Sequence, residues 1–220
     1  MNQPISQVFN MDCIEGMKQY PDKHFDLAIV DPPYGIKMNG GVSYGRPSRP
    51  NQYKSIKPPK HAKKKWDNER PHSDYWEQIY RVSKNQIFFG ANYFVDFLKP
   101  SMGWIYWGKF EDDSNFSDGE LVYTSFNRAL RSFYLHPFHG TNGGKERIHP
   151  TQKPVALYDW ILHNYAKQGD IILDTHLGSQ SSRIAAYKAA FDFTGYELDK
   201  EYFEQGNKRF NLFKSQLRMF

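Results

Sequence analysis

The clearest chemical motif in the chain is Asp31-Pro32-Pro33-Tyr34, directly after the apolar run Phe25–Val30. Proline has a fixed φ and no N–H, so two in a row hold the backbone rigid and leave the Pro32 carbonyl without a neighbouring donor. The Asp31 carboxylate and this carbonyl then form two adjacent hydrogen-bond acceptors, with the flat ring of Tyr34 beside them. Such a site fits a planar ligand that carries an amino group. The alternative is a plain turn in which Asp31 acts as a cap.

A second group of candidates lies near the other end of the chain. Ile171–Asp174 is expected to be a buried strand, and the turn Thr175–Ser179 that follows it contains Gly178. Glu197 stands 23 positions after Asp174, close to the ~20 typical between a glycine-containing turn and the acid that accepts ribose hydroxyls. The spacing therefore predicts a nucleotide-binding unit of strand, turn, helix and strand.

The DPPY motif comes first along the chain and the strand, turn and acid come later. In this order, the two motifs resemble those of the amino-group DNA methyltransferases in their beta arrangement. DPPY is similar to the catalytic motif, and HPTQKP at 149–154 with the strand and turn after it is similar to the cofactor-binding part. The resemblance covers roughly residues 8–34 and 148–210. It implies methyl transfer from S-adenosyl-L-methionine to an amino group of double-stranded DNA, as in restriction-modification systems, with the target base flipped out of the stack.

The resemblance favours adenine N6 as the target atom, because an aspartate in the first position of DPPY is more typical of the adenine enzymes. Cytosine N4 is kept as the alternative. Cytosine C5 chemistry is not expected, since it needs a cysteine nucleophile and Cys13 lies outside any suitable motif. An NAD-dependent oxidoreductase is not expected either, because residues 174–183 lack the G-x-G-x-x-G pattern.

The resemblance also implies roles for individual residues. The catalytic residues are expected to be Asp31, Pro32, Pro33 and Tyr34. The cofactor-binding residues are expected to be Asp12, Cys13, Thr151, Lys153, Asp174, Thr175, His176, Gly178, Ser179 and Glu197. Among these, Asp174 and the turn would hold the methionine end of the cofactor, Thr151 and Lys153 would lie near its carboxylate, Glu197 would bind the ribose, and Asp12 would lie near the adenine amino group. No metal ligand is expected.

The cofactor turn departs from the family pattern. It reads DTHLGSQSS where the family usually has a sequence like DPFxGSGTT: Thr175 and His176 replace proline and phenylalanine, and Gln180 replaces the second glycine. A side chain at position 180 is expected to crowd the cofactor or to force a different turn. A decayed, non-catalytic DNA-binding relative is therefore a further alternative.

Positive charge is concentrated in one segment of the chain. The net charge is +5, and nine Lys and Arg residues without any Asp or Glu lie between Gly35 and Trp66. Because this segment directly follows DPPY, it is expected to emerge beside the target base and to contact DNA phosphates; the alternative is a solvated loop. The expected DNA-binding residues are Lys54, Lys57, Lys60, Lys63, Lys64 and Lys65, with Arg128, Arg131, Asn142, Lys145 and Arg147 as candidate base readers.

Strands and helices alternate along the chain, which predicts an α/β fold with a mainly parallel sheet covered by helices on both faces. The strands are expected at 25–30, 86–89, 104–107, 121–126, 171–174 and 193–197, and the helices at 73–82 with Ser73 as N-cap, at 93–98, from Pro154 to Gly169, at 181–190 and from 199 onward. The resemblance implies seven strands in a Rossmann-like methyltransferase sheet. Ligands of such sheets bind at the carboxyl ends of the strands, where Asp31, Asp174 and Glu197 fall. A single catalytic domain over 1–220 is expected, with 35–72 and about 127–148 as DNA-recognition insertions.

Composition narrows the remaining classes of protein. Hydrophobic residues make up 39% of the chain and aromatic residues 17%, so wholesale disorder is not expected. No apolar run reaches the ~18 residues of a membrane span, and the first residues lack the pattern of a signal peptide. A single cysteine excludes an internal disulfide. These features predict a cytoplasmic protein, and they leave open a homodimer and a separate restriction endonuclease as partners.

Overall fold

The computed structural model describes residues 3–37, 64, 66–109, 117–142 and 146–217. The strands are β1 (Ser6–Phe9), β2 (Phe25–Val30), β3 (Ser83–Phe89), β4 (Trp104–Gly108), β5 (Gly119–Thr124), β6 (Arg131–Tyr134), β7 (Ile171–Asp174) and β8 (Asp192–Tyr196). The helices are α1 (Cys13–Met17), α2 (Ser73–Val82), α3 (Val155–Tyr165), α4 (Ser181–Lys188) and α5 (Lys200–Leu217), with a 3₁₀ turn η1 (Ala91–Tyr93).

All the described strands form one sheet in the order β1-β8-β7-β2-β3-β5-β4-β6. Strands β1, β8, β7, β2 and β3 are parallel to one another, β5 is antiparallel to both β3 and β4, and β6 is parallel to β4. The expected mainly parallel α/β sheet is confirmed. It has eight strands, one more than the seven that the resemblance implies. The short edge strands β1 and β6, which carry no apolar run, are the two that the sequence ranges did not include.

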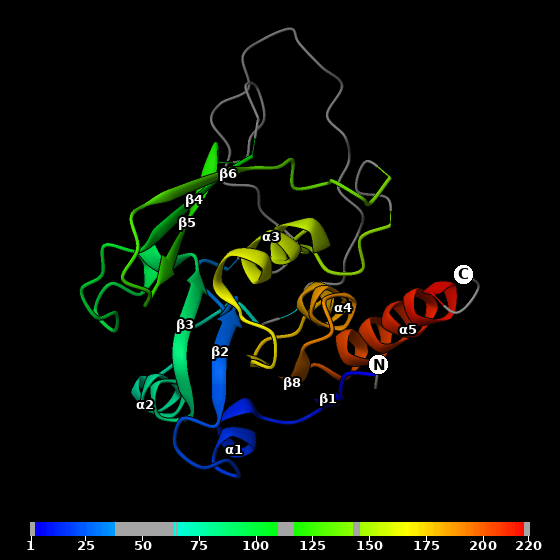
Figure 1. Cartoon of the computed structure of the whole chain (residues 1–220), viewed down its shortest axis with the longest axis horizontal. Helices are drawn as coiled ribbons and strands as arrows, with labels where there is room; N and C mark the ends of the chain where they lie inside the picture. The colour runs from blue at the N-terminus through cyan, green and yellow to red at the C-terminus, as the bar shows by residue number, and fades with distance from the viewer. Residues whose placement is uncertain (1–2, 38–63, 65, 110–116, 143–145, 218–220) are drawn as a thin grey trace, which may run out of the picture.

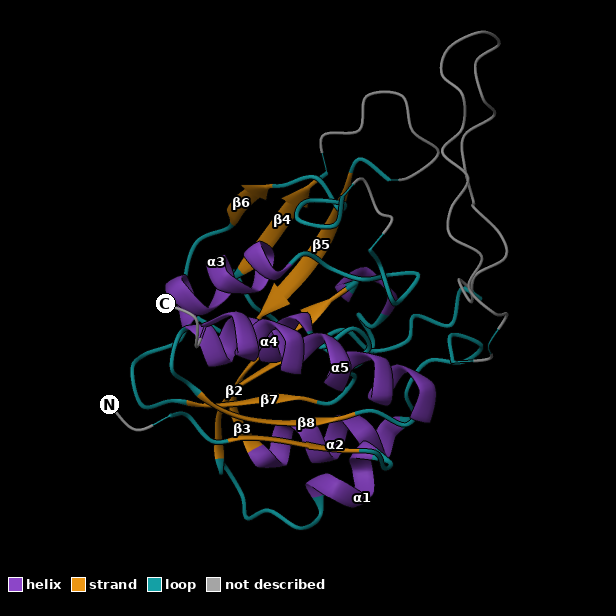
Figure 2. Ribbon diagram, turned by 90° about the vertical axis from the view of Figure 1, so that its right-hand side faces the viewer, coloured by secondary structure: helices purple, strands orange, loops and turns teal. Residues whose placement is uncertain are grey.

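Helices cover both faces of the sheet (Figures 1 and 2). Helices α3, α4 and α5 lie on one face, and α1 and α2 lie on the other. The side chains of β2 alternate between the two cores: Leu27 and Ile29 pack toward α3 and α4, whereas Ala28 and Val30 pack toward α1 and α2. A one-residue slip would exchange these two sets, so burial on both faces fixes the register of β2. The residue after it, Asp31, therefore leaves the sheet at a defined place.

Two local predictions were wrong. Ser73 is the first residue of α2 rather than its N-cap; His72 holds the cap position, with no side-chain hydrogen bond at this end. The helix expected at 93–98 is only the turn η1, because Gly90 enters it in a left-handed conformation and Phe94 leaves it at φ −129° and ψ 19°. Pro154 precedes α3 as its cap residue, as suits a residue that has no N–H to donate.

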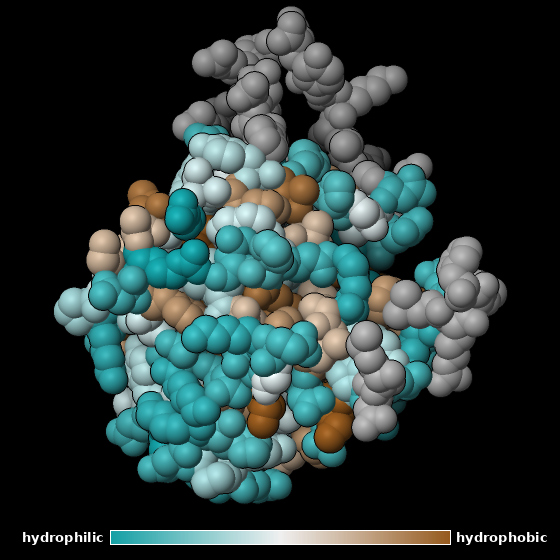
Figure 3. Space-filling model, in the orientation of Figure 1, coloured by the Kyte–Doolittle hydropathy of each residue, from teal (hydrophilic) through white to brown (hydrophobic). Residues whose placement is uncertain are grey.

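The surface seen in Figure 3 is mostly hydrophilic, with isolated hydrophobic residues between the polar ones. Among the helices of the described ranges, none combines the length and the apolar character needed to cross a membrane.

The turn before α4 is built around Gln180, which takes a left-handed conformation with φ 58°. Its side chain is fully buried and points toward α5: Oε1 accepts a hydrogen bond from Arg183 Nη1 at 2.9 Å, and Nε2 donates to the Phe203 carbonyl at 3.3 Å. A Cβ atom at Gly206 would lie 2.6 Å from Cγ of Gln180. The missing side chain at Gly206 therefore provides the space that the side chain at 180 occupies.

The contact between Gln180 and Gly206 predicts a change in stability for a substitution at 206, and the sign of that change depends on the residue at 180. Alanine normally stabilises a helix interior by about 1 kcal/mol relative to glycine, but Gly206→Ala overpacks the Gln180 site, which typically costs about 1–3 kcal/mol. We expect Gly206→Ala to lower the free energy of unfolding in the natural chain and to raise it in a Gln180→Gly background, measured by urea denaturation. The same sign in both backgrounds would contradict the contact.

Candidate active site

A cavity of about 1400 Å³ opens at the carboxyl ends of the parallel strands. Of the residues that the sequence singled out for catalysis or cofactor binding, it is lined by Asp12, Cys13, Asp31, Pro32, Pro33, Tyr34, Thr151, Lys153, Thr175, His176, Gly178, Ser179 and Glu197. Asp174 does not line it. The structure thus brings segments that lie more than 100 positions apart in the chain around one space.

Asp67 fixes the turn that carries the DPPY motif. Its Oδ1 atom accepts hydrogen bonds from the backbone N–H groups of Tyr34 at 2.7 Å and Gly35 at 2.9 Å. The residue is 1% exposed, and a buried carboxylate with such donors is an effective clamp. Sequence reasoning missed Asp67, because nothing in the sequence near it indicates a partner 33 positions earlier.

The ring of Tyr34 is held by its neighbours. Tyr93 stacks on it, with ring centroids 5.0 Å apart and an interplanar angle of 16°. Gly90 approaches it so closely that a Cβ there would lie 2.2 Å from the ring. Tyr93 occupies one face, so a planar ligand has only the other face of Tyr34 available for stacking.

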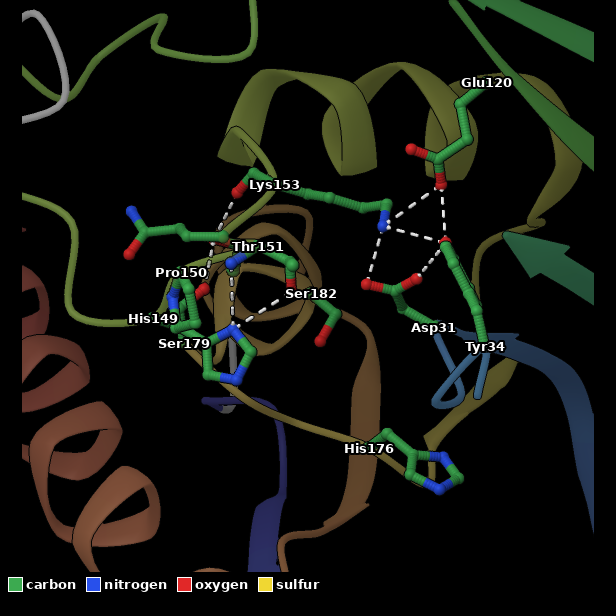
Figure 4. A network of polar contacts seen from close by, with 12 residues as sticks. Asp31, Tyr34, Glu120, His149, Pro150, Thr151, Lys153, His176, Ser179 and Ser182 are labelled. Atoms are coloured by element: carbon green, nitrogen blue, oxygen red, sulfur yellow. Dashed lines mark hydrogen bonds and ion pairs between the residues drawn. The ribbon is translucent and has the colours of Figure 1, made fainter. Parts of the chain in front are cut away.

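A cluster of charged side chains surrounds the Tyr34 hydroxyl (Figure 4). The Lys153 ammonium lies 2.6 Å from Asp31 Oδ2 and 3.2 Å from Glu120 Oε1. The Tyr34 hydroxyl lies 2.6 Å from Asp31 Oδ1 and 2.7 Å from Glu120 Oε1. On its other side, Glu120 Oε2 is 3.1 Å from the ammonium of Lys109. The sequence placed Lys153 near the cofactor carboxylate; here its ammonium binds the first residue of DPPY.

Burial and mutual charge set the protonation of this cluster. Burial raises the pKa of Asp31, and the Lys153 ammonium opposes that shift. Burial alone would also raise the pKa of Glu120, but Lys153 and Lys109 outweigh it and lower this pKa to about 2. Burial and the two carboxylates raise the pKa of Tyr34 well above its usual value. Glu120 is therefore ionised near neutral pH, and the Tyr34 hydroxyl keeps its proton.

The antiparallel direction of β5 explains why Glu120 reaches this site. Parallel strands end at the cavity, whereas β5 begins there, so its second residue lies at the same edge as Asp31. Glu120 pairs with Trp107 of β4, and Lys109 follows that strand directly. No sequence motif marks either residue, and only the strand direction could have indicated them.

The other half of the cavity contains Glu197, directly after β8. Its Oε2 atom accepts a hydrogen bond from Gly178 N at 2.8 Å, and its Oε1 atom accepts one from Asp199 N at 2.8 Å. An ionised carboxylate has about four acceptor positions, so these bonds leave two for a ligand in the cavity. Burial raises the pKa of Glu197, and the two backbone N–H groups oppose that shift.

Asp174 binds the turn between β7 and α4 through both of its carboxylate oxygens. Its Oδ1 atom accepts a hydrogen bond from His176 N at 3.0 Å, and its Oδ2 atom accepts one from the Ser182 hydroxyl. Burial raises the pKa of Asp174 to about 7. The carboxylate therefore ties the end of β7 to the start of α4 instead of lining the cavity.

The residues that replace proline and phenylalanine form a hydrogen-bonded chain. The hydroxyls of Tyr75 and Thr175 lie 2.9 Å apart, and Thr175 Oγ1 lies 2.9 Å from His176 Nδ1. Burial lowers the pKa of His176 to about 4, so the ring is neutral near pH 7. The third replacement, Gln180, does not line the cavity. The expectation that it crowds a ligand is wrong, because its side chain packs against α5 instead.

Asp12 and Cys13 lie at the amino end of α1, on the rim of the same cavity. Asp12 Oδ1 caps the helix by accepting hydrogen bonds from Ile14 N at 2.8 Å and Glu15 N at 3.3 Å. Burial raises the pKa of Cys13 to about 12. A thiol with such a pKa is not a nucleophile near neutral pH.

Lys64 is bound to the protein itself. Its ammonium lies 2.7 Å from Asp199 and 2.8 Å from Glu201, and 4.0 Å from the centre of the Tyr202 ring. The other expected phosphate-binding residues, Lys54, Lys57, Lys60, Lys63 and Lys65, lie outside the described residues.

Two of the candidate base readers also bind the protein. Arg128 donates to the Asn164 carbonyl and Arg147 to the Pro150 carbonyl. Arg131 and Asn142 are exposed, and Lys145 lies outside the described part of the chain. The structure therefore leaves Arg131 and Asn142 as the described residues of this group that remain accessible to DNA.

Comparison with known proteins agrees with this geometry. Residues 109–208 match the family model described as DNA methylase. The chain is 26% identical to the Type II methyltransferase M.HpaI of Haemophilus parainfluenzae, over 90% of this chain and 72% of that protein. Its fold is similar to the M1.HpyAVI–SAM complex, with a TM-score of 0.59, 20% identity and coverage of 93% and 98%.

A further solved structure, the cytosine-N4-specific PvuII DNA methyltransferase, has a TM-score of 0.61 at 12% identity, with coverage of 95% of this chain and 90% of that one. The resemblance that the two motifs suggested is thus confirmed: in sequence and in fold, this chain is similar to the N6/N4 amino-group DNA methyltransferases.

Proposed function

We propose that the protein transfers a methyl group from S-adenosyl-L-methionine to N6 of an adenine flipped out of double-stranded DNA. The observation that carries the proposal is the joining of the DPPY acceptors and the Glu197 carboxylate in one cavity. Its volume of about 1400 Å³ exceeds the ~300–1,000 Å³ typical of a single-ligand site. The space suits two ligands side by side, a base near Asp31 and a nucleoside cofactor near Glu197.

The residues around Glu197 fit the cofactor. The Glu197 carboxylate has two acceptor positions left for the ribose hydroxyls. Gly178 keeps the turn in a left-handed conformation at φ 47°. The neutral ring of His176 and the Thr175 hydroxyl replace apolar groups without filling the cavity. These features favour a working cofactor site over the alternative of a decayed DNA-binding protein.

The cofactor supplies a methyl group on a sulfonium, which is already a good leaving group. The task of the chain is then to orient the amine and to complement developing charge. The Asp31 carboxylate and the Pro32 carbonyl accept the two N–H bonds of the target amine, which directs its lone pair toward the methyl group. The Lys153 ammonium, 2.6 Å from Asp31 Oδ2, opposes the rise that burial causes in the pKa of Asp31 and so favours the charged acceptor. Stacking on Tyr34 returns ~1–3 kcal/mol of the cost of flipping the base.

Methyl transfer from labelled S-adenosyl-L-methionine to mixed-sequence duplex DNA, followed by mass spectrometry of the nucleosides, tests this function. N6-methyladenine is the expected product. N4-methylcytosine would retain the site and the mechanism and change the base, which is the alternative that the PvuII fold similarity keeps in view. DNA binding without any methyl transfer would instead support the alternative of a decayed, non-catalytic DNA-binding relative.

Removing the Asp31 carboxylate tests the catalytic assignment. We expect Asp31→Ala to reduce kcat at least ~10²-fold, by analogy with the loss of one preorganised hydrogen-bonding group at other active sites. Lys153 still has Glu120 as a counter-ion in this variant, so the site should remain folded. DNA binding should therefore persist. Single-turnover methylation is the measurement, with Asp22→Ala at an exposed ion pair as the control. Normal turnover by Asp31→Ala would refute the mechanism.

Glu197 is tested by equilibrium binding of S-adenosylhomocysteine, which needs no turnover. We expect Glu197→Gln to weaken binding roughly tenfold or more, because hydrogen bonds to a charged group contribute about 1.5–3 kcal/mol. The matched control is Glu201→Gln nearby, whose carboxylate is largely exposed and pairs with Lys64. Equal effects of the two substitutions would place the cofactor elsewhere.

We also propose that residues 35–72 and about 127–148 contact DNA, the first mainly through its lysines. Replacing Lys60, Lys63 and Lys65 together with alanine should weaken binding and reduce the slope of log K against log salt by about 3, since each phosphate contact contributes ~0.9. Lys64→Ala is the control: this lysine is held by Asp199 and Glu201, so its loss should leave the slope unchanged. A triple variant with the natural slope would mean that these lysines are only solvated.

A further inference from the structure

The Tyr34 hydroxyl has one proton to donate and two carboxylates within hydrogen-bond distance. It lies 2.6 Å from Asp31 Oδ1 and 2.7 Å from Glu120 Oε1, and a neutral phenol donates one hydrogen bond at a time. The hydroxyl therefore has a choice of acceptor. The ring itself has little freedom, because Tyr93 stacks on it and Gly90 leaves no room behind it.

This choice matters for the function proposed above, on which the present inference rests. A target amine needs a free lone pair on Asp31. Two donors from the chain already use that carboxylate, Lys153 at Oδ2 and Tyr34 at Oδ1. A hydroxyl that donated only to Asp31 would share Oδ1 with the amine and leave that oxygen one acceptor position instead of two.

We propose that Glu120 is a positioning residue that takes the hydrogen bond of the Tyr34 hydroxyl while Asp31 accepts the target amine. The donor then moves from one carboxylate to the other without moving the ring, so the stacking surface and the acceptor pair are available together. No covalent bond changes in this step, and no proton leaves the hydroxyl.

The surroundings of Glu120 suit that role. It is anchored at the start of β5, its side chain is 13% exposed, and the ammonium groups of Lys109 and Lys153 lie 3.1 and 3.2 Å away. Two positive neighbours keep the carboxylate ionised, and an ionised acceptor forms the stronger hydrogen bond. Its position on a strand of the sheet fixes the distance to Tyr34 better than a loop would.

A double-mutant cycle of Glu120→Ala and Tyr34→Phe tests the inference, with single-turnover methylation as the readout. We expect Glu120→Ala to reduce the single-turnover rate by roughly tenfold to hundredfold in the natural background. In the Tyr34→Phe background, which has no hydroxyl to reposition, the same substitution should have at most a small effect. Cofactor-analogue binding should be unchanged throughout, because Glu120 lies at the base-binding end of the cavity.

The conservative variant separates positioning from support of the fold. Glu120→Gln retains an oxygen that can accept from Tyr34, so it should keep more of the rate than Glu120→Ala, and it serves in the cycle if the alanine variant does not fold. Rate losses that simply multiply across the cycle would overturn the inference and leave the proposed function intact. A natural protein that transfers no methyl group to DNA would overturn both.

Discussion

The site depends on charges that cannot be buried separately. Removing a carboxylate or an ammonium from water costs several kcal/mol per ion, and a buried pair that loses one partner is typically destabilised by 3–5 kcal/mol. Lys153, with its side chain 5% exposed, lies between Asp31 and Glu120, and Lys109 completes the set. The two ammonium groups keep Glu120 ionised, and Lys153 opposes the rise that burial causes in the pKa of Asp31. A buried acceptor such as Asp31 depends on such neighbours.

Strand β5, which is antiparallel to its neighbours β3 and β4, brings these groups together. Asp31 leaves the end of β2, while Glu120 lies at the start of β5, whose reversed direction places that start at the same edge. Lys153 comes from the segment before α3, and Asp67 closes over the DPPY turn from a fourth segment. A parallel strand in the position of β5 would have placed its first residues at the opposite edge of the sheet.

The sequence predicted the parts of this arrangement that are encoded locally. Asp31 and Glu197 directly follow short apolar strands and Asp174 ends one, and strand ends in a parallel sheet meet at one edge. Glu120 and Asp67 were not found, because their roles depend on strand direction and on contacts between distant segments. The helix expected at 93–98 was wrong since the left-handed Gly90 and the close approach of Tyr34 decide the backbone there. Gln180 was misread for a similar reason: its partner Gly206 lies 26 positions later.

The turn between β7 and α4 shows how the structure accommodates a departure from a family pattern. Gln180 takes a left-handed conformation, and its side chain forms two hydrogen bonds, to Arg183 of α4 and to Phe203 of α5, in the space that Gly206 leaves. The Thr175 hydroxyl forms hydrogen bonds with the Tyr75 hydroxyl and with His176 Nδ1, so these three polar atoms all have partners. Compared with proline and phenylalanine, Thr175 and His176 change the chemistry of the cavity wall from apolar to hydrogen-bonding, and Asp174 binds the turn at His176 N and the Ser182 hydroxyl. A change of residue type at this turn is thus a change in what the wall offers a ligand, and not a sign that the site has collapsed.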